Sequence, residues 1–188
     1  MFAFSVSRTR FQVRYSDILK GQMAAKPQVR LLVVGRLRER YWQDAEAEYR
    51  KRLTAYTTRL EILEVTDEPT PDDASLAQEQ TTRQKEAERL LLKITDREYV
   101  IALDGTQGKA FTSPGFAGHL EKVLTDGAHS TLTFVIGGSL GLHDSLLSRT
   151  DLIVSFGAFT FPHQLMRVLL LEQMYRAFKI QSGQPYHK

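Results

Sequence analysis

The residues best suited to chemistry lie in one short stretch near the C-terminus, GAFTFPHQLMR at 157–167. Its first half is apolar, and it then sets Pro162 before His163, with Arg167 four residues later. A proline fits the start of a helix, where its missing N–H costs no hydrogen bond, so we expect His163 at a helix N-terminus. Residues four apart in a helix share one face. Such a pair can move a proton and hold an anion, although the pattern also fits a histidine that only caps a buried helix.

Three glycine-containing segments each follow a short apolar run. They are LDGTQGKAFTS at 103–113, IGGSLGL at 136–142 and GAFTFPH at 157–163. Glycine lets the backbone approach a ligand closely and adopt positive φ. If the apolar runs are parallel strands, these segments meet at the carboxyl ends of the strands, where α/β folds bind ligands. One such segment alone is only a turn, but the three together favour a site that wraps an adenine and a ribose.

The sequence also excludes several common chemistries. It contains no cysteine, and therefore no disulfide, iron–sulfur cluster or thiol nucleophile. Its five histidines lie 10 to 24 residues apart, unlike paired zinc ligands, so no metal is expected. The stretch IGGSLG lacks the spacing of the dinucleotide-binding fingerprint. The chain also has no phosphate-binding G-x-x-x-x-G-K-[ST] loop and no serine-hydrolase G-x-S-x-G elbow.

The elements that must position these residues alternate between strand and helix. The strand-like runs are continuously apolar, which indicates a sheet covered on both faces. We therefore predict an α/β fold with a mostly parallel sheet and helices on both faces. The expected strands are 29–35, 60–65, 99–103, 131–136 and 151–156, and the expected helices are 40–60, 74–94, 113 to just before Gly127, 143–149 and 162–180.

Charge and composition limit the domain organisation and the partners. The net charge is +3, but residues 1–27 alone carry +4, so the remainder is close to neutral and any RNA affinity needs a local patch. Residues 1–22 have no sustained periodicity and are expected to be disordered or to precede the true start at Met23. A single domain is expected over 23–188. No apolar run approaches the length of a membrane helix, and a cytoplasmic location is expected.

Four ordered motifs resemble the RlmH family of SPOUT-class methyltransferases over about residues 29–188. They are IALDGTQGKAFTSPGFA, FVIGGSLGL, FTFPHQLMRVLLLEQMYRAFKI and the terminal PYHK. The resemblance implies a C-terminal trefoil knot that binds S-adenosyl-L-methionine beside the partner subunit of a homodimer. It further implies N3-methylation of a pseudouridine in a hairpin loop of 23S rRNA. The near-neutral body of the protein favours the assembled ribosome over free RNA as the substrate.

The resemblance also carries site residues over onto this chain. For catalysis it implies His163, Arg167, Tyr186 and His187, with either histidine as the general base and Tyr186 stacked on the flipped base. For RNA binding it implies Arg167, Arg176 and Lys188. Many family members have serine where this chain has Gly157, which puts one side-chain hydrogen bond to the cofactor in doubt. The implied cofactor-binding residues are Leu103, Gly138, Phe156, Gly157, Ala158, Phe159, Thr160 and Phe161.

Two other functions stay open at this point. One is a SPOUT-type transfer to another RNA position, such as a ribose 2′-hydroxyl or a tRNA base. The other is a ribosome-binding module that keeps the fold without catalysis. The intact glycine segments and the intact PYHK terminus argue against the second alternative.

Overall fold

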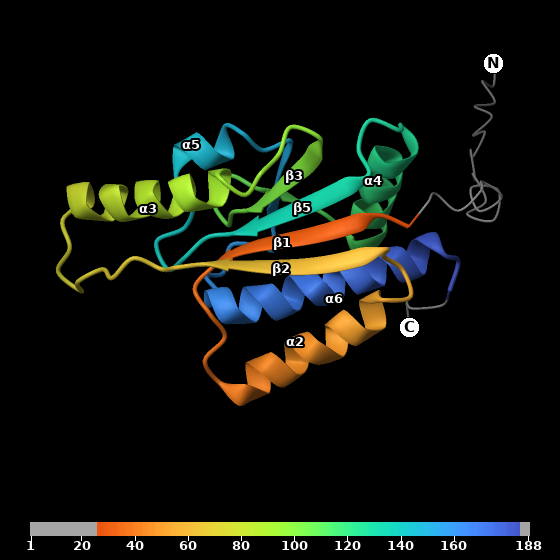
Figure 1. Cartoon of the computed structure of the whole chain (residues 1–188), viewed down its shortest axis with the longest axis horizontal. Helices are drawn as coiled ribbons and strands as arrows, with labels where there is room; N and C mark the ends of the chain where they lie inside the picture. Colours follow the sequence, from red (N-terminus) through yellow and green to blue (C-terminus); the bar gives the residue numbers. More distant parts are fainter. Residues whose placement is uncertain (1–25, 185–188) are drawn as a thin grey trace, which may run out of the picture.

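The computed structural model describes residues 26–184. Within this range the chain forms one six-stranded sheet flanked by helices (Figure 1). The predicted extension at 1–22 lies outside the described residues, as do the predicted site residues Tyr186, His187 and Lys188.

All the strand pairs of the sheet are parallel, which confirms and sharpens the predicted fold class. The strand order is β2-β1-β5-β3-β6-β4, so β1 from the start of the described chain pairs with β5 in the middle of the sheet. Parallel pairing directs every strand's carboxyl end to one edge of the sheet. The strands are β1 (Gln28–Val34), β2 (Arg59–Val65), β3 (Glu98–Leu103), β4 (Lys109–Ala110), β5 (Thr131–Ile136) and β6 (Leu152–Ser155).

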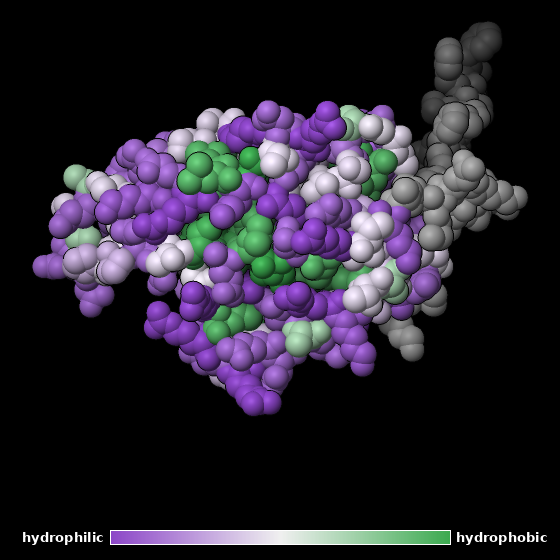
Figure 2. All heavy atoms as spheres, viewed as in Figure 1, coloured by the Kyte–Doolittle hydropathy of each residue, from purple (hydrophilic) through white to green (hydrophobic). Residues whose placement is uncertain are grey.

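Helices cover both faces of the sheet, as the continuous apolar strands predicted (Figure 1). One face packs on α2 (Arg40–Leu53), α4 (Ser113–Thr125) and α6 (His163–Gln181). The other face packs on α3 (Leu76–Leu91) and α5 (Asp144–Leu147). No helix between residues 26 and 184 is long and apolar enough to cross a membrane. Figure 2 shows hydrophilic side chains over most of the face in view.

Most element boundaries lie within about three residues of the prediction, and two larger differences each have a local reason. The helix expected over 40–60 ends at Leu53, and the Thr57 hydroxyl donates to the Leu53 carbonyl at 3.0 Å. Tyr56 lies in the turn after this helix, but its ring still faces the core and stacks on Phe178 of α6. Its apolar side chain therefore extended the helical pattern in the sequence beyond the end of the helix. The second difference is β4, which was expected to be part of a loop. Its two residues are exposed and give no apolar run to recognise.

The connection from β3 to β4 crosses the end of β6, because β6 lies between these two strands in the sheet. The crossing is so close that only glycine fits at position 108. A Cβ atom there would lie 2.4 Å from the Val154 carbonyl carbon and 2.5 Å from the Ser155 nitrogen. The chain therefore wraps around β6 shortly before α6 begins. The trefoil knot implied by the resemblance is consistent with this strand order.

Candidate active site

A cavity of about 410 Å³ lies at the carboxyl ends of β3, β5 and β6. Its wall is built from the three glycine-containing segments that the sequence singled out. His163 at the start of α6 and Met166 complete one side. The structure thus brings together, around one cavity, every residue expected to bind the cofactor: Leu103, Gly138, Phe156, Gly157, Ala158, Phe159, Thr160 and Phe161.

The segment after β5 makes a tight turn in which glycines are required. Gly141 has φ of 82°, and its N–H donates to the Gly138 carbonyl at 3.1 Å. A Cβ atom on Gly138 would lie 2.9 Å from Oε2 of Glu86 and 3.2 Å from Cγ1 of Val34. Glu86 is buried, which raises the pKa of its carboxyl, and it accepts from the Glu68 N–H at 3.0 Å. Gly138 therefore lies between the cavity and the buried Glu86 and Val34, and a side chain at this position requires the Glu86 carboxylate or the turn to move.

Gly138→Val is expected to abolish cofactor binding, because the added side chain either enters the cavity or pushes the turn into it. Isothermal calorimetry with S-adenosylmethionine measures the effect, and circular dichroism checks the fold. Gly118→Ala in α4 is a matched control, since a Cβ atom there has nothing within 4 Å. Unchanged affinity in a folded Gly138→Val protein would show that this turn is not part of the binding site.

The segment after β3 is ordered by a carboxylate at the cavity. Asp104 accepts hydrogen bonds from the Thr106 N–H and hydroxyl, each at 2.7 Å, and from the Gln107 N–H at 3.0 Å. Burial raises the pKa of Asp104, but these hydrogen bonds outweigh burial and leave it below its usual range. Asp104 is thus an anion whose own loop holds it in place.

His163 is the first residue of α6, is half-buried and lines the cavity. Its ring lies against the end of β1, where a Cβ atom on Gly35 would be 3.4 Å from Nε2. Burial lowers the pKa of His163, the Asp67 carboxylate raises it, and the Arg38 and Arg167 cations lower it. The net effect is a lowered pKa, so the ring is neutral at neutral pH.

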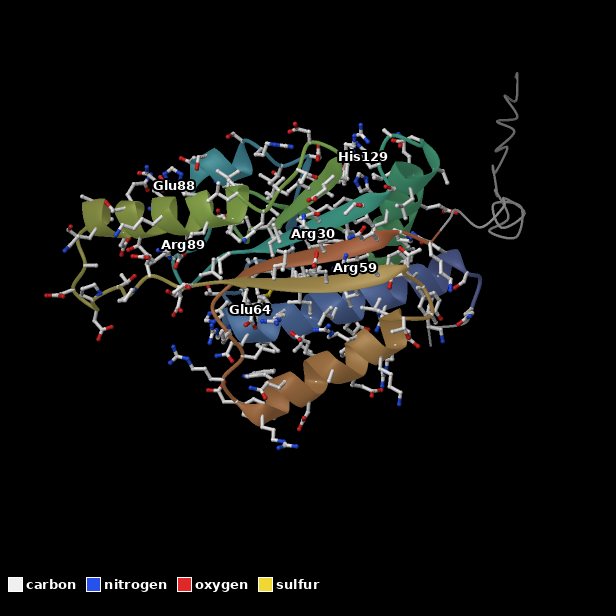
Figure 3. The ribbon with its side chains drawn as sticks, in the orientation of Figure 1. Arg30, Arg59, Glu64, Glu88, Arg89 and His129 are labelled. Carbon is white, nitrogen blue, oxygen red and sulfur yellow. The ribbon has the colours of Figure 1, made fainter. Side chains whose placement is uncertain are left out.

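Arg167 lies one turn after His163 in α6 but is not among the residues that line the cavity. It is only 5% exposed and forms ion pairs with Glu46 of α2 and Glu64 of β2. Its Nη1 donates to Glu64 Oε1 at 2.8 Å, whereas Nε contacts Glu46 without the alignment of a hydrogen bond. Figure 3 shows Glu64 beside the start of α6. In the single chain this guanidinium forms a structural ion pair, and the RNA contact and the catalytic role expected for Arg167 stay predictions.

Arg176 is two turns further along α6 and is partly buried. Its Nη2 lies 2.7 Å from Glu172 Oε1 in an ion pair within the helix. Arg176 is not among the residues that line the cavity. Its predicted contact with RNA therefore stays a prediction.

Two charged residues at the cavity were missed by the sequence analysis, Arg83 of α3 and Asp144 of α5. Both come from the helices on the other face of the sheet from α6. Arg83 does not follow a glycine-rich strand end, which was the signal that identified the other residues, and Asp144 comes two residues after the segment 136–142. Their relation to the cavity depends on how α3 and α5 pack, and no sequence pattern reports that.

Comparison with known proteins first defines the class. Residues 28–187 match the profile of the family described as predicted SPOUT methyltransferase. The chain therefore belongs to the SPOUT methyltransferase family. The resemblance found in the sequence is thereby confirmed.

Individual relatives make the similarity more specific. Ribosomal RNA large subunit methyltransferase H of Streptococcus thermophilus (strain CNRZ 1066) is 52% identical over 160 residues, which cover 85% of this chain and 99% of the relative. The protein of the same name from Streptococcus pyogenes serotype M5 (strain Manfredo) is 50% identical over the same coverage. Among solved structures, a methylase family protein from Haemophilus influenzae Rd KW20 is 12% identical with a TM-score of 0.46, covering 87% of this chain and 72% of that one.

Proposed function

We propose that this protein transfers a methyl group from S-adenosyl-L-methionine to N3 of a pseudouridine in a hairpin loop of 23S rRNA. The observation that carries the proposal is the convergence of three distant glycine-containing segments and His163 on one cavity. The high identity to rRNA methyltransferases over nearly their whole length supports the class of substrate. The assembled ribosome is the proposed form of that substrate.

The lining of the cavity fits this cofactor. Ile136, Leu142 and Phe156 offer an apolar wall for an adenine, and the glycines expose backbone groups that can bind its edges. The cavity of about 410 Å³ is in the usual range for a small ligand. When bound, S-adenosylmethionine supplies a methyl group carried on a sulfonium. No cluster of metal-binding side chains occurs among residues 26–184, and the proposed reaction requires none.

His163 is the proposed general base for the N3 proton. A neutral imidazole accepts a proton, and it does not repel the positive charge of a sulfonium nearby. Two features favour the neutral ring: its partial burial and its place at a helix N-terminus, where the helix dipole disfavours a cation. His187 is the alternative base, and Tyr186 is proposed to stack on the flipped base.

As the pH is lowered, kcat/KM is expected to decrease with an apparent pKa below the usual imidazole value of about 6.5. The sign follows from the lowered pKa of His163: the ring loses its proton at a lower pH than free imidazole, so activity is already full near neutrality. Initial rates on ribosomes across pH test this, and the decrease should vanish in His163→Ala. A decrease centred well above the usual value would point to another base.

A homodimer is proposed as the active form, with the partner covering the cavity. Phe159 supports this, because its side chain is 83% exposed in the single chain although it lines the cavity. A large apolar side chain left in water at a binding site is typical of a surface that a partner covers. Residues 23–188 are proposed as one domain that acts in the cytoplasm. Arg176 and Lys188 are the proposed RNA contacts.

Nucleoside analysis of a gene-deletion strain tests the proposed reaction. Loss of 3-methylpseudouridine from 23S rRNA, and of no other modification, is the expected result. Loss of a ribose 2′-O-methyl group or of a methylated tRNA base would favour the other SPOUT-type reaction. An unchanged set of nucleosides would favour the non-catalytic ribosome-binding module.

A further inference from the structure

Arg83 is a cation at the cavity that forms no ion pair within the described residues and has no role in the proposed proton transfer. It projects from the middle of α3 and lines the cavity with the turn after β5 and with Asp144. Among the described residues that line the cavity it is the one permanent cation. This distinguishes it from the other arginine of α3, Arg89 (Figure 3), which donates to the Thr66 carbonyl and the Glu68 carboxylate.

The guanidinium of Arg83 is held in place by a neutral group. Its Nη2 donates to Gln80 Oε1 at 2.9 Å, one turn earlier in α3. The Gln80 amide nitrogen lies 3.0 Å from His143 Nε2, and the other ring nitrogen of His143 lies 2.8 Å from the Ser145 hydroxyl. This chain of hydrogen bonds links α3 to α5 and orients the guanidinium, but it contains no carboxylate that neutralises it.

The same guanidinium has hydrogen-bonding capacity left over. Its Nε is buried and has no hydrogen-bond partner within the described part of the chain. No carboxylate between residues 26 and 184 lies within 4.0 Å of it as an ion pair, in contrast to Arg167, whose buried Nε contacts Glu46. A buried donor without a partner costs free energy, and an anionic ligand in the cavity would remove that cost.

The charges of the cavity lining complement those of the proposed cofactor. The lining carries one arginine and two aspartates, Asp104 and Asp144. S-adenosylmethionine carries one carboxylate, one ammonium and one sulfonium, which is the opposite set. Its adenine and ribose are neutral and suit the apolar wall and the glycine segments. Among residues 26–184, the cavity lining therefore offers one permanent cation to the single negative group of the cofactor.

We propose that Arg83 binds the α-carboxylate of the methionyl part of S-adenosylmethionine. This inference rests on the proposed function, since it takes the cofactor as given. Guanidinium and carboxylate pair through two parallel N–H···O bonds. Gln80 accepts from only one nitrogen of Arg83, Nη2, so other N–H groups of the guanidinium are left for such a pair. The carboxylate thereby fixes the amino-acid end of the cofactor between α3 and α5.

Decarboxylated S-adenosylmethionine provides the test, because it differs from the cofactor only in the group that Arg83 is proposed to bind. Calorimetry on the full chain compares both ligands in wild type and in Arg83→Gln. We expect the substitution to lower the affinity for S-adenosylmethionine by roughly 10- to 100-fold, the usual scale for a hydrogen bond to a charged group. The affinity for the decarboxylated ligand should change less than about twofold, and wild type should itself prefer the carboxylated form.

Controls separate the possible failures. Arg59→Gln removes an exposed arginine from the start of β2, at the opposite edge of the sheet (Figure 3), and should leave both affinities unchanged. Arg83→Lys keeps the charge and should retain part of the preference for the carboxylate. If Arg83→Gln lowers the affinity for both ligands equally, or lowers neither affinity, the assignment of Arg83 is overturned. Wild type that binds neither ligand would overturn the proposed function itself.

Discussion

His163→Ala is expected to lower the methylation rate at saturating substrate by roughly 10²-fold or more, the usual scale for loss of a general base. Cofactor affinity should stay within a few-fold of wild type. The two effects separate because His163 is one of many residues that line the cavity, and most of the lining comes from the glycine-containing segments. Single-turnover kinetics on ribosomes give the rate, and calorimetry gives the affinity.

His119→Ala is the matched control for this experiment. His119 is also partly buried, which lowers its pKa, and its Nε2 lies 3.0 Å from the Tyr99 hydroxyl. It is not among the residues that line the cavity, so its loss should leave the methylation rate unchanged. Normal turnover by His163→Ala would make this ring structural, and the base would then be sought at His187 or in the RNA.

Arg167→Ala is expected to lower the free energy of unfolding by about 1–3 kcal/mol, because a buried carboxylate loses a charged partner. Glu46 is buried and keeps only Arg50 as an ion-pair partner within residues 26–184. The more exposed Glu64 keeps only Arg36 in the same range. The ion pairs join α2, β2 and α6, so the N-terminal turn that carries His163 should loosen as well. Urea denaturation followed by circular dichroism measures the effect.

Two further variants test whether charge is the cause. Arg52→Ala breaks the exposed pair with Glu48 in α2 and should cost less than about 1 kcal/mol. Arg167→Met combined with Glu46→Gln and Glu64→Gln removes the charges together and should recover much of the stability. A stable Arg167→Ala protein with weakened ribosome binding would contradict the structural role and support the RNA contact that the sequence suggested.

The strands and the cavity were predictable because their signals are local. Continuous apolar runs indicated buried parallel strands, and glycines after 103, 136 and 156 marked the strand ends that form the cavity. The strand β4 escaped prediction because two exposed residues carry no pattern. Its pairing with β6 depends on a segment more than forty residues away.

The side-chain roles of the arginines were not predictable in the same way. Helical spacing correctly put His163 and Arg167 on one helix, but it does not tell whether a residue faces solvent or the interior. The partners of Arg167 come from α2 and β2, far earlier in the chain. Arg83 was missed for the converse reason, since only the packing of α3 against α5 brings it to the cavity.

The most direct test of the central claim uses the purified protein with S-adenosylmethionine and ribosomes from a strain that lacks the gene. Mass spectrometry of the 23S rRNA fragments should show one added methyl group, on a pseudouridine of a single hairpin loop, and none without the cofactor. His163→Ala should leave that fragment unmodified over the same time. A fragment that gains no methyl group, or a methyl group found on a ribose or on another RNA, would contradict the account.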